Sequence, residues 1–406
     1  MFTISSSKKV LLIISSLALF MNFSSASAAS TNFVDTGMKS QVQAMTADNS
    51  HIYAGGTDSS GHPFVSSYDP TTNTWTDITS NLSAALPNLN ITALAYANSP
   101  FNHEPPALYV AGNSSNQAYV YEYLNGAWVN EDPQNQINDS SGQPSFFQIT
   151  SLISLPNSPT QSGYELYGEG AIVSSSCNNI PVDQTALVGT PGSQLWQVDF
   201  FDTIGIINAT TVLNDGSFLI VGQNANTDDE FCSFSWNGQF AYTIYQGEGV
   251  FINNGLDTNA PAFLKALQTY NNPQDKQAEL YTGGMNSKGA ASVYIYQPGS
   301  SPSNSSWKDI STGLPQNNNS TVETFAVLYG VLYAAGGDNK GDAFVYQFNG
   351  IPTAPQWKNI SNTDIPSQYQ TTSLMTLNST LYAGGDSPTG AAPFPGFVYS
   401  YTPATK

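Results

Sequence analysis

Short apolar runs recur along the chain between polar segments, and each of seven runs closes on a small residue or a glycine pair. These runs occupy residues 52–56, 108–112, 166–170, 218–222, 280–284, 332–337 and 381–385. The spacing from one run to the next is roughly 50 to 60 residues, which is typical of propellers and other repeat arrays. The pattern therefore predicts a repeat architecture before any single residue is considered.

The first repeat shows the expected local structure. Four apolar or alternating runs, at 42–45, 52–54, 64–68 and 75–78, are separated by residues that favour turns. Four short strands joined by tight turns form an antiparallel meander. Other repeats carry Asn-Gly between their runs, a strong hairpin signal, and we expect hairpins at 125–126, 237–238 and 349–350.

Several expected strands are apolar on both sides, as in Val293–Tyr296. A sheet that faces water on one side alternates between apolar and polar residues, whereas a sheet covered on both faces does not. The blades of a propeller are covered by a neighbour on each face. We therefore predict an all-β fold, a seven-bladed β-propeller of four-stranded antiparallel blades, with six or eight blades as the alternatives.

The outermost strand of each repeat is marked by an aromatic residue, and six such residues are Trp75, Trp128, Trp196, Phe240, Trp307 and Trp357. The seventh repeat stops after 397–401, which reads as its third strand. Residues 32–37 resemble 306–311, with Phe33 in the tryptophan position. We expect this N-terminal segment to complete the last blade beside Tyr399 and so remove an exposed strand edge.

The first residues have the features of an export signal. Lys8 and Lys9 precede a short apolar stretch, and Ala26-Ser27-Ala28 fits a cleavage site. The apolar stretch is shorter than the roughly 20 residues that span a bilayer. We predict a signal peptide at 1–28, a single propeller domain at 29–406, and a secreted or periplasmic monomer without membrane insertion.

Charge excludes several classes of partner. The chain has 10 lysines, no arginine and 29 acidic residues, a net charge of −19. Loss of the signal peptide removes two lysines and makes it −21. Nucleic acids and anionic membranes are repelled by such a surface, and arginine forks for phosphate or carboxylate are lacking. Polar but uncharged residues fill the loops, while 40% hydrophobic content indicates a packed core.

Two cysteines, Cys177 and Cys232, fall in neighbouring repeats. An even number of cysteines in an exported chain favours a disulfide between them. The alternative is a pair of buried thiols.

The repeat resembles a known family. Gly55-Gly56, Tyr68 and the run Asp69-Pro70-x-Thr-Asn73-x-Trp75 resemble the Kelch repeat, most closely in repeats one, five and six. The resemblance covers almost the whole mature chain and implies a galactose-oxidase-like propeller fold. It says little about function, because the shared residues serve packing and turns. Kelch-like propellers include binding scaffolds, copper oxidases and sialic acid mutarotases.

Enzymatic interpretations find limited support. A copper oxidase site needs two histidine ligands, and His51, His62 and His103 all fall near predicted turns, which favours solvent-facing side chains. Sialidase chemistry needs arginines, and the mutarotase resemblance is weakened for the same reason. No Gly-x-Ser-x-Gly elbow or phosphate-binding glycine loop occurs.

The residues that follow the glycine signature are the best candidates for a site. We predict ligand-binding roles for Asn113, Gln223, Asp338 and Asp386. Asp338 and Asp386 fall in corresponding loops of adjacent repeats, where carboxylates of two loops are suited to hold Ca²⁺. The alternative is that each one bonds the backbone of its own turn, the usual role of Asp there.

Two functions are therefore considered. The first is an exported, non-catalytic binding propeller whose partner is a protein or a neutral glycan, engaged through long loops at 97–106, 130–144, 170–184 and 246–261. The second is a calcium-assisted hydrolase or lactonase at the propeller axis. The innermost strands carry few charges, which disfavours catalysis in the channel, although Glu323 is an exception.

Overall fold

The computed structural model describes residues 32–97, 106–115, 117–131, 145–156, 164–174, 180–190, 195–200, 205–212, 218–228, 233–245, 248–273, 278–316, 319–361, 364–365, 368–387 and 396–403. The predicted signal peptide, His103, Cys177 and Cys232 lie outside these residues, so the processing and disulfide predictions stay predictions. No helix of the described part is long and apolar enough to cross a membrane.

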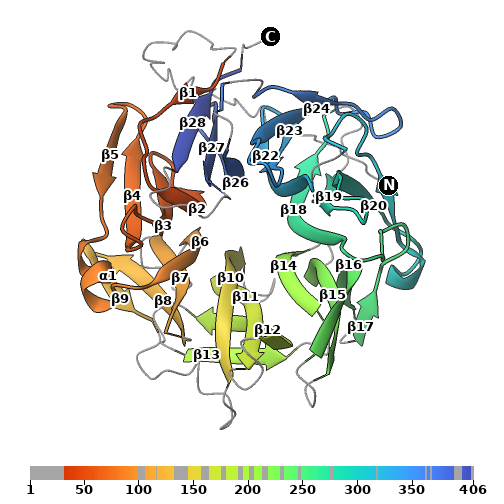
Figure 1. Cartoon of the computed structure of the whole chain (residues 1–406), viewed down its shortest axis with the longest axis horizontal. Helices are drawn as coiled ribbons and strands as arrows, with labels where there is room; N and C mark the ends of the chain where they lie inside the picture. The colour runs from red at the N-terminus through yellow and green to blue at the C-terminus, as the bar shows by residue number, and fades with distance from the viewer. Residues whose placement is uncertain are drawn as a thin grey trace, which may run out of the picture.

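The described residues form seven four-stranded antiparallel sheets arranged in a ring (Figure 1). Blade 1 contains β2 (Gln41–Ala47), β3 (Ile52–Thr57), β4 (Pro63–Asp69) and β5 (Thr74–Asp77). Blade 2 contains β6 (Asn90–Ala97), β7 (Ala107–Ser114), β8 (Gln117–Leu124) and β9 (Ala127–Asn130). Blade 3 contains β10 (Ser145–Pro156), β11 (Tyr164–Ser174), β12 (Ile180–Thr190) and β13 (Leu195–Phe200). Helix α1 (Ser80–Ala85) connects blades 1 and 2.

The second half of the ring repeats the arrangement. Blade 4 contains β14 (Gly205–Val212), β15 (Phe218–Asp228), β16 (Ser233–Tyr245) and β17 (Glu248–Phe251). Blade 5 contains β18 (Phe263–Asn271), β19 (Ala278–Met285), β20 (Ala291–Gln297) and β21 (Ser306–Asp309), with the 3₁₀ helix η2 (Pro302–Asn304) before β21. Blade 6 contains β22 (Thr321–Leu328), β23 (Val331–Gly337), β24 (Phe344–Phe348) and β25 (Trp357–Asn359). Blade 7 contains β26 (Gln370–Leu377), β27 (Thr380–Asp386), β28 (Phe397–Tyr401) and β1 (Val34–Asp35).

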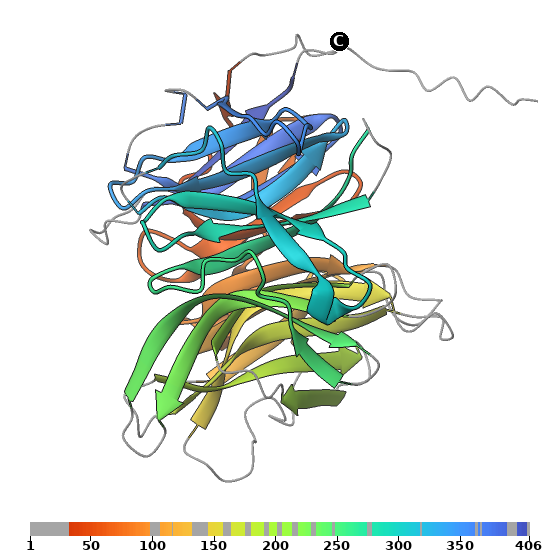
Figure 2. The same ribbon diagram turned by 90° about the vertical axis from the view of Figure 1, so that its right-hand side faces the viewer.

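The ring closes where the two ends of the described chain meet, as both ribbon views show (Figures 1 and 2). Val34 pairs with Ser400 and Asp35 with Tyr399, so β1 is the outermost strand of blade 7. The Phe33 ring stacks on Tyr401 with 5.0 Å between the ring centroids. The predicted closure by the N-terminal segment is confirmed, and the seven sheets match the predicted number of blades.

Tryptophans of the outer strands bind the blade before them. The indole Nε1 of Trp128, Trp307 and Trp357 donates a hydrogen bond of 2.8–2.9 Å to a backbone carbonyl of the preceding blade, at Ile78, Ile252 and Ile310 respectively. Each of these rings also packs on an aromatic residue of its own blade. The repeated tryptophan therefore stabilises contacts both within blades and between them.

Blade 4 departs from the expected pattern. Phe240 lies in β16, the third strand, and the outermost strand is β17 instead. The Asn237-Gly238 pair lies inside β16 beside a register shift, so it forms a bulge and not the predicted hairpin. Because β16 has 13 residues, the chain turns only after Tyr245. The sequence places the turn too early, since a bulge and a hairpin both use glycine at positive φ.

Two of the expected long loops are partly strand. The segment 170–184 contains the end of β11 and the start of β12, and 246–261 contains β17. These segments are mainly polar and contain few apolar residues, so their composition does not predict the strands that they form. The interiors of 97–106 and 130–144 fall mostly outside the described residues.

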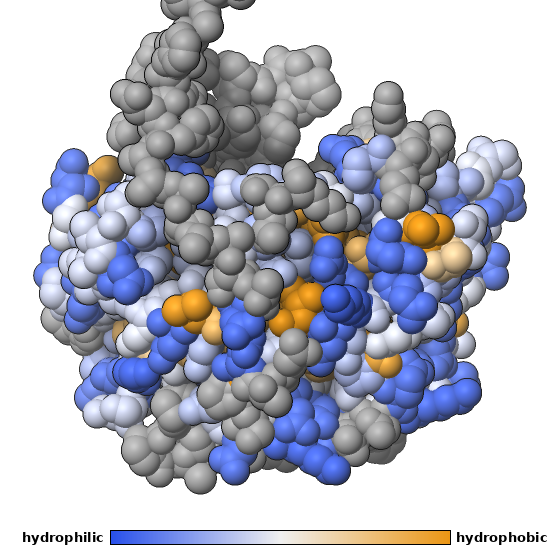
Figure 3. Space-filling view, turned by 90° about the horizontal axis from the view of Figure 1, so that it is seen from above, coloured by the Kyte–Doolittle hydropathy of each residue, from blue (hydrophilic) through white to orange (hydrophobic). Residues whose placement is uncertain are grey.

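The outer surface seen in Figure 3 is mainly hydrophilic, and hydrophobic residues occur there in small separate groups. Large hydrophobic side chains that are exposed include Leu124, Tyr329 and Ile351, from blades 2 and 6. Isolated apolar residues of this kind are ordinary on a protein surface and do not mark an interface.

Candidate functional site: the central channel

Every innermost strand contains a register shift at the same place, where one extra residue bulges out of the strand pairing. A bulge redirects the side chain of the extra residue. All seven extra residues are polar: Gln43, Thr92, Thr150, Asn208, Lys265, Glu323 and Thr372. We call them the bulge residues.

A glycine of the repeated signature lies opposite the residue that precedes each bulge. In blade 1 that glycine is Gly56, which pairs with Val42. A Cβ atom at Gly56 would collide with the carbonyl oxygen of Gln41. The same collision with a bulged backbone occurs in blades 2, 5, 6 and 7. The recurrent glycine is therefore required by the bulge and not only by the end of the strand.

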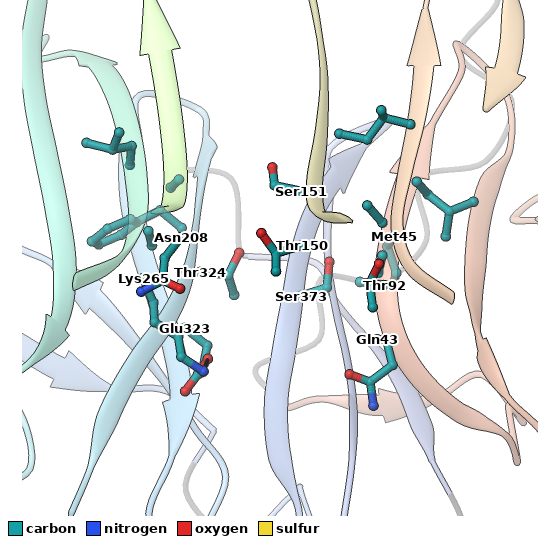
Figure 4. Close-up of a pocket in the computed structure, with 18 residues that line it drawn as sticks. Gln43, Met45, Thr92, Thr150, Ser151, Asn208, Lys265, Glu323, Thr324 and Ser373 are labelled. Atoms are coloured by element: carbon teal, nitrogen blue, oxygen red, sulfur yellow. Dashed lines mark ion pairs between the residues drawn. The ribbon is translucent and has the colours of Figure 1, made fainter. Parts of the chain in front are cut away.

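Residues from all seven innermost strands line a central cavity of about 290 Å³. Six of the bulge residues line it, together with apolar side chains that include Met45, Leu94 and Phe325. Figure 4 shows the labelled polar side chains converging from opposite sides, with Lys265 beside Glu323 and with Gln43 across the channel. Convergent polar groups in an otherwise apolar cavity are the usual features of a binding site.

Three bulge residues link their blade to the next one around the ring. The hydroxyl of Thr92 donates to the carbonyl of Ile149, and the hydroxyl of Thr372 donates to that of Val42, both at 2.6 Å. The carboxamide nitrogen of Asn208 likewise donates to the carbonyl of its neighbour's Leu264 at 2.6 Å. Each acceptor immediately precedes the next bulge. Because the hydroxyl protons of Thr92 and Thr372 are used between blades, their oxygens are left as hydrogen-bond acceptors, and Asn208 keeps its carbonyl oxygen and one N–H.

Lys265 and Glu323, on adjacent blades 5 and 6, form an ion pair of 2.8 Å between Nζ and Oε2. The Glu323 side chain is 15% exposed and that of Lys265 is 41% exposed. The pair is therefore partly shielded from solvent, and its carboxylate is the more enclosed partner.

Asp386, at the end of β27, lies between these charges and blade 1. Its carboxylate accepts hydrogen bonds from the side-chain amides of Gln43 and Gln370. Burial raises the pKa of Asp386, and the negative charge of Glu323 adds to the rise. The two amide hydrogen bonds and the positive charge of Lys265 act in the opposite direction. Four adjacent blades therefore contribute to one polar cluster, formed by Gln43, Lys265, Glu323, Gln370 and Asp386.

Of the residues predicted from sequence, Asp386 belongs to this cluster and Asn113 does not. The Asn113 side chain binds both backbone groups of Ile149, with bonds of 3.3 Å to the carbonyl and 3.1 Å from the amide. The Asn113 carboxamide therefore links blade 2 to blade 3 by the same pair of hydrogen bonds, one donated and one accepted, that a backbone peptide group makes. Gln223 is half-buried in β15, where it pairs with Ile206 and Gln239.

Asp338 occupies a turn. Its Oδ1 accepts bonds of 2.9 Å from the backbone amides of Lys340 and Asp342. Asp58 and Asn286 make the same two bonds in the corresponding turns of blades 1 and 5. This is the turn role that the sequence left open beside calcium binding.

Asp338 and Asp386 are not corresponding residues. In strand register, Asp386 pairs with Gln370, whereas the residue of blade 6 at that position is Gly337, which pairs with Thr321. Both aspartates lie where the second strand of their blade leads into the third, but they differ by one position in strand register, because the blade 6 signature is one residue longer. Adjacent positions of a strand face opposite sides of the sheet, so the side chains of Asp338 and Asp386 lie in different surroundings. Calcium binding by this pair stays a prediction, and an ion there would have to displace the bonds just described.

The histidines that the structure describes lie in turns on the surface. His51 is 41% exposed, with Nδ1 3.4 Å from Asp48. His62 is 55% exposed, with Nδ1 3.7 Å from Asp58. Their placement agrees with the expectation of solvent-facing turn residues.

Comparison with known proteins supports the fold. No protein-family model matches the chain, and no curated protein matches it. A solved structure titled "YCF48 bound to D1 peptide" is similar, with a TM-score of 0.53 and 10% identity. The match covers 92% of this chain and 96% of that chain. At this identity the likeness shows the fold alone, which is a β-propeller.

Proposed function

We propose that this chain is a non-catalytic binding propeller whose ligand is a polypeptide segment seated at the mouth of the central channel. The observation that carries the proposal is the ring of bulge residues. Thr92, Asn208 and Thr372 are each hydrogen-bonded to the next blade, so a ligand would meet acceptor atoms that are already fixed in place. Preorganised groups of this kind lower the entropic cost of binding.

Two further features support a polypeptide. Turns built on Asp58, Asn286 and Asp338 connect the second and third strands of their blades, at the end where the polar cluster lies. They offer backbone groups around the mouth. The similar solved structure is described as bound to a peptide, which lends support by analogy of fold. We also propose that the chain is exported and that its blades are of the Kelch type.

The proposal is tested by screening immobilised protein against peptide and glycan arrays. We expect peptide binding that is abolished by Thr150→Trp, because Thr150 is exposed inside the channel. The matched control is Leu124→Trp, at an exposed position of β8 away from the channel. Both variants must keep the wild-type circular dichroism spectrum. Glycan binding alone, or peptide binding that is indifferent to Thr150→Trp, would reject the proposal.

A calcium-assisted hydrolase or lactonase is the alternative. Glu323 and Asp386 are the carboxylates nearest the channel in the polar cluster, but Lys265 and Gln43 already bind them. A hydrolytic activity that is lost on chelation and restored by calcium would favour this alternative.

A further inference from the structure

The channel wall is rich in hydrogen-bond acceptors. Thr92 and Thr372 donate their hydroxyl protons to the next blade, and Asn208 donates one of its two amide protons in the same way. The two threonines therefore retain only oxygen lone pairs, while Asn208 retains its carbonyl oxygen and one N–H. One amide proton of Gln43 is likewise directed to Asp386, and the carbonyl oxygen of Gln43 is an acceptor.

The charges favour a cationic ligand. Glu323 of blade 6 and Asp386 of the adjacent blade 7 are the two carboxylates of the polar cluster, and Lys265 is its one cation. The chain as a whole has a net charge of −19, which attracts cations to a cleft and repels anions. Lys265 itself shows that an ammonium group fits against Glu323, with its nitrogen at 2.8 Å.

The apolar part of the wall indicates which kind of cation. Met45, Leu94 and Phe325 line the same cavity as three members of the polar cluster, Gln43, Lys265 and Glu323. A lysine side chain combines an apolar stem with a charged end, and it buries the stem along apolar surface. A bare metal ion would make no use of this apolar wall.

On the basis of the proposed function, we infer that the partner inserts a lysine side chain into the channel. Its ammonium group binds between Glu323 and Asp386, and the oxygen lone pairs of the uncharged bulge residues accept its remaining protons. Lys265 then competes with the incoming lysine for Glu323. Removal of Lys265 is therefore expected to strengthen binding, an effect that a damaged fold does not produce.

The experiment uses calorimetric titration of the full mature chain with two short peptides. Each has one central residue between glycines and blocked ends; the central residue is lysine in one and norleucine in the other. We expect the lysine peptide to bind about tenfold more tightly or better, because norleucine has the stem without the charge. n-Butylamine supplies the same ammonium without a polypeptide.

Variants locate the site. We expect Glu323→Gln and Asp386→Asn each to weaken lysine-peptide binding about tenfold, and Lys265→Met to strengthen it about threefold. The control is Asp342→Asn, which removes the same charge from an exposed residue of the blade 6 turn and is expected to leave affinity unchanged. Melting curves establish that each variant is folded.

The outcomes separate this inference from the function on which it rests. Peptide binding that is blocked by Thr150→Trp but equal for lysine and norleucine would keep the proposed function and overturn the lysine inference. Equal affinity for n-butylamine and the lysine peptide would contradict the claim that the bound ammonium group belongs to a polypeptide. An unchanged affinity in Glu323→Gln and Asp386→Asn would also overturn the inference. Absence of binding to every peptide of the array would overturn both.

Discussion

The aromatic rings of Phe33 and Tyr401 stack at a centroid distance of 5.0 Å, although the two residues lie at opposite ends of the chain. The backbone amide of Phe33 also donates to the Asp364 carboxylate at 3.0 Å. Phe33 is 6% exposed, so its ring is part of the core that closes the circle of blades. This contact joins the first described strand to the last one.

Phe33→Ala is expected to destabilise the protein by about 3 kcal/mol, because it removes a buried aromatic ring at the closure. Val34→Ala is the control, since Val34 directly follows Phe33, in β1, and is 53% exposed. Urea unfolding measures both. Equal stability of the two variants would show that the closing strand does not hold the ring together.

The glycine pairs give a graded prediction. A Cβ at Gly55 would approach Leu94 Cδ1 to 2.6 Å, and that side chain is able to move, whereas a Cβ at Gly56 would strike the backbone of Gln41. We expect Gly55→Ala to cost about 1 kcal/mol and Gly56→Ala about 3 kcal/mol or more. Thermal unfolding ranks them, and the reverse order would contradict the bulge as the reason for the second glycine.

Two adjacent threonines are expected to respond in opposite directions. Thr371 is fully buried, and its Oγ1 has no hydrogen-bond partner among the described residues, whereas Thr372 Oγ1 donates to Val42. Thr371→Val is expected to stabilise the protein by about 1 kcal/mol, because it removes an unsatisfied hydroxyl without a change of shape. Thr372→Val is expected to destabilise by about 1 kcal/mol, because it breaks a link between blades. A loss of stability in Thr371→Val, measured by urea unfolding, would contradict this assignment.

Asp386 is expected to make stability depend on pH. Since burial raises its pKa in the folded state, the folded protein binds this proton more readily than the unfolded chain. The contribution of this carboxyl group to the stability of the folded protein is complete below the ordinary carboxyl pKa of roughly 3.9. It is lost as pH rises through the raised pKa of Asp386. We therefore expect Asp386→Asn to gain stability relative to wild type between acid and neutral pH, while exposed Asp342→Asn shows no such trend. A relative loss over that range would contradict the direction of the shift.

The fold was largely predictable because its signals are local. Glycine pairs and outer-strand tryptophans follow from backbone crowding and from packing within one blade, and the same pattern identifies Phe33. The sequence assigns Phe240 to the wrong strand because bulges and hairpins both use glycine. The number of blades followed from the count of signatures, without any knowledge of contacts between blades.

The site was less predictable because it depends on contacts between blades. The sequence predicts Asp386 as a site residue, but it does not indicate Lys265, Gln43 or most other bulge residues. A signal does exist: in six blades a Val, Ile or Leu immediately precedes the polar bulge residue, as in Val42-Gln43 and Leu264-Lys265. That dipeptide identifies the bulge once the register with the glycine is known, and the register comes only from the paired strands.

The central claim is that the bulge residues face an open, cation-favouring channel. It is tested most directly by the reactivity of single introduced cysteines toward cationic and anionic methanethiosulfonate reagents, with the wild-type chain as the blank. Thr150→Cys is expected to react readily and to favour the cationic reagent more strongly than Leu124→Cys on the outer surface, while buried Ile149→Cys stays unreactive. Faster reaction at position 149 than at 150, or a preference for the anionic reagent at 150, would contradict the account.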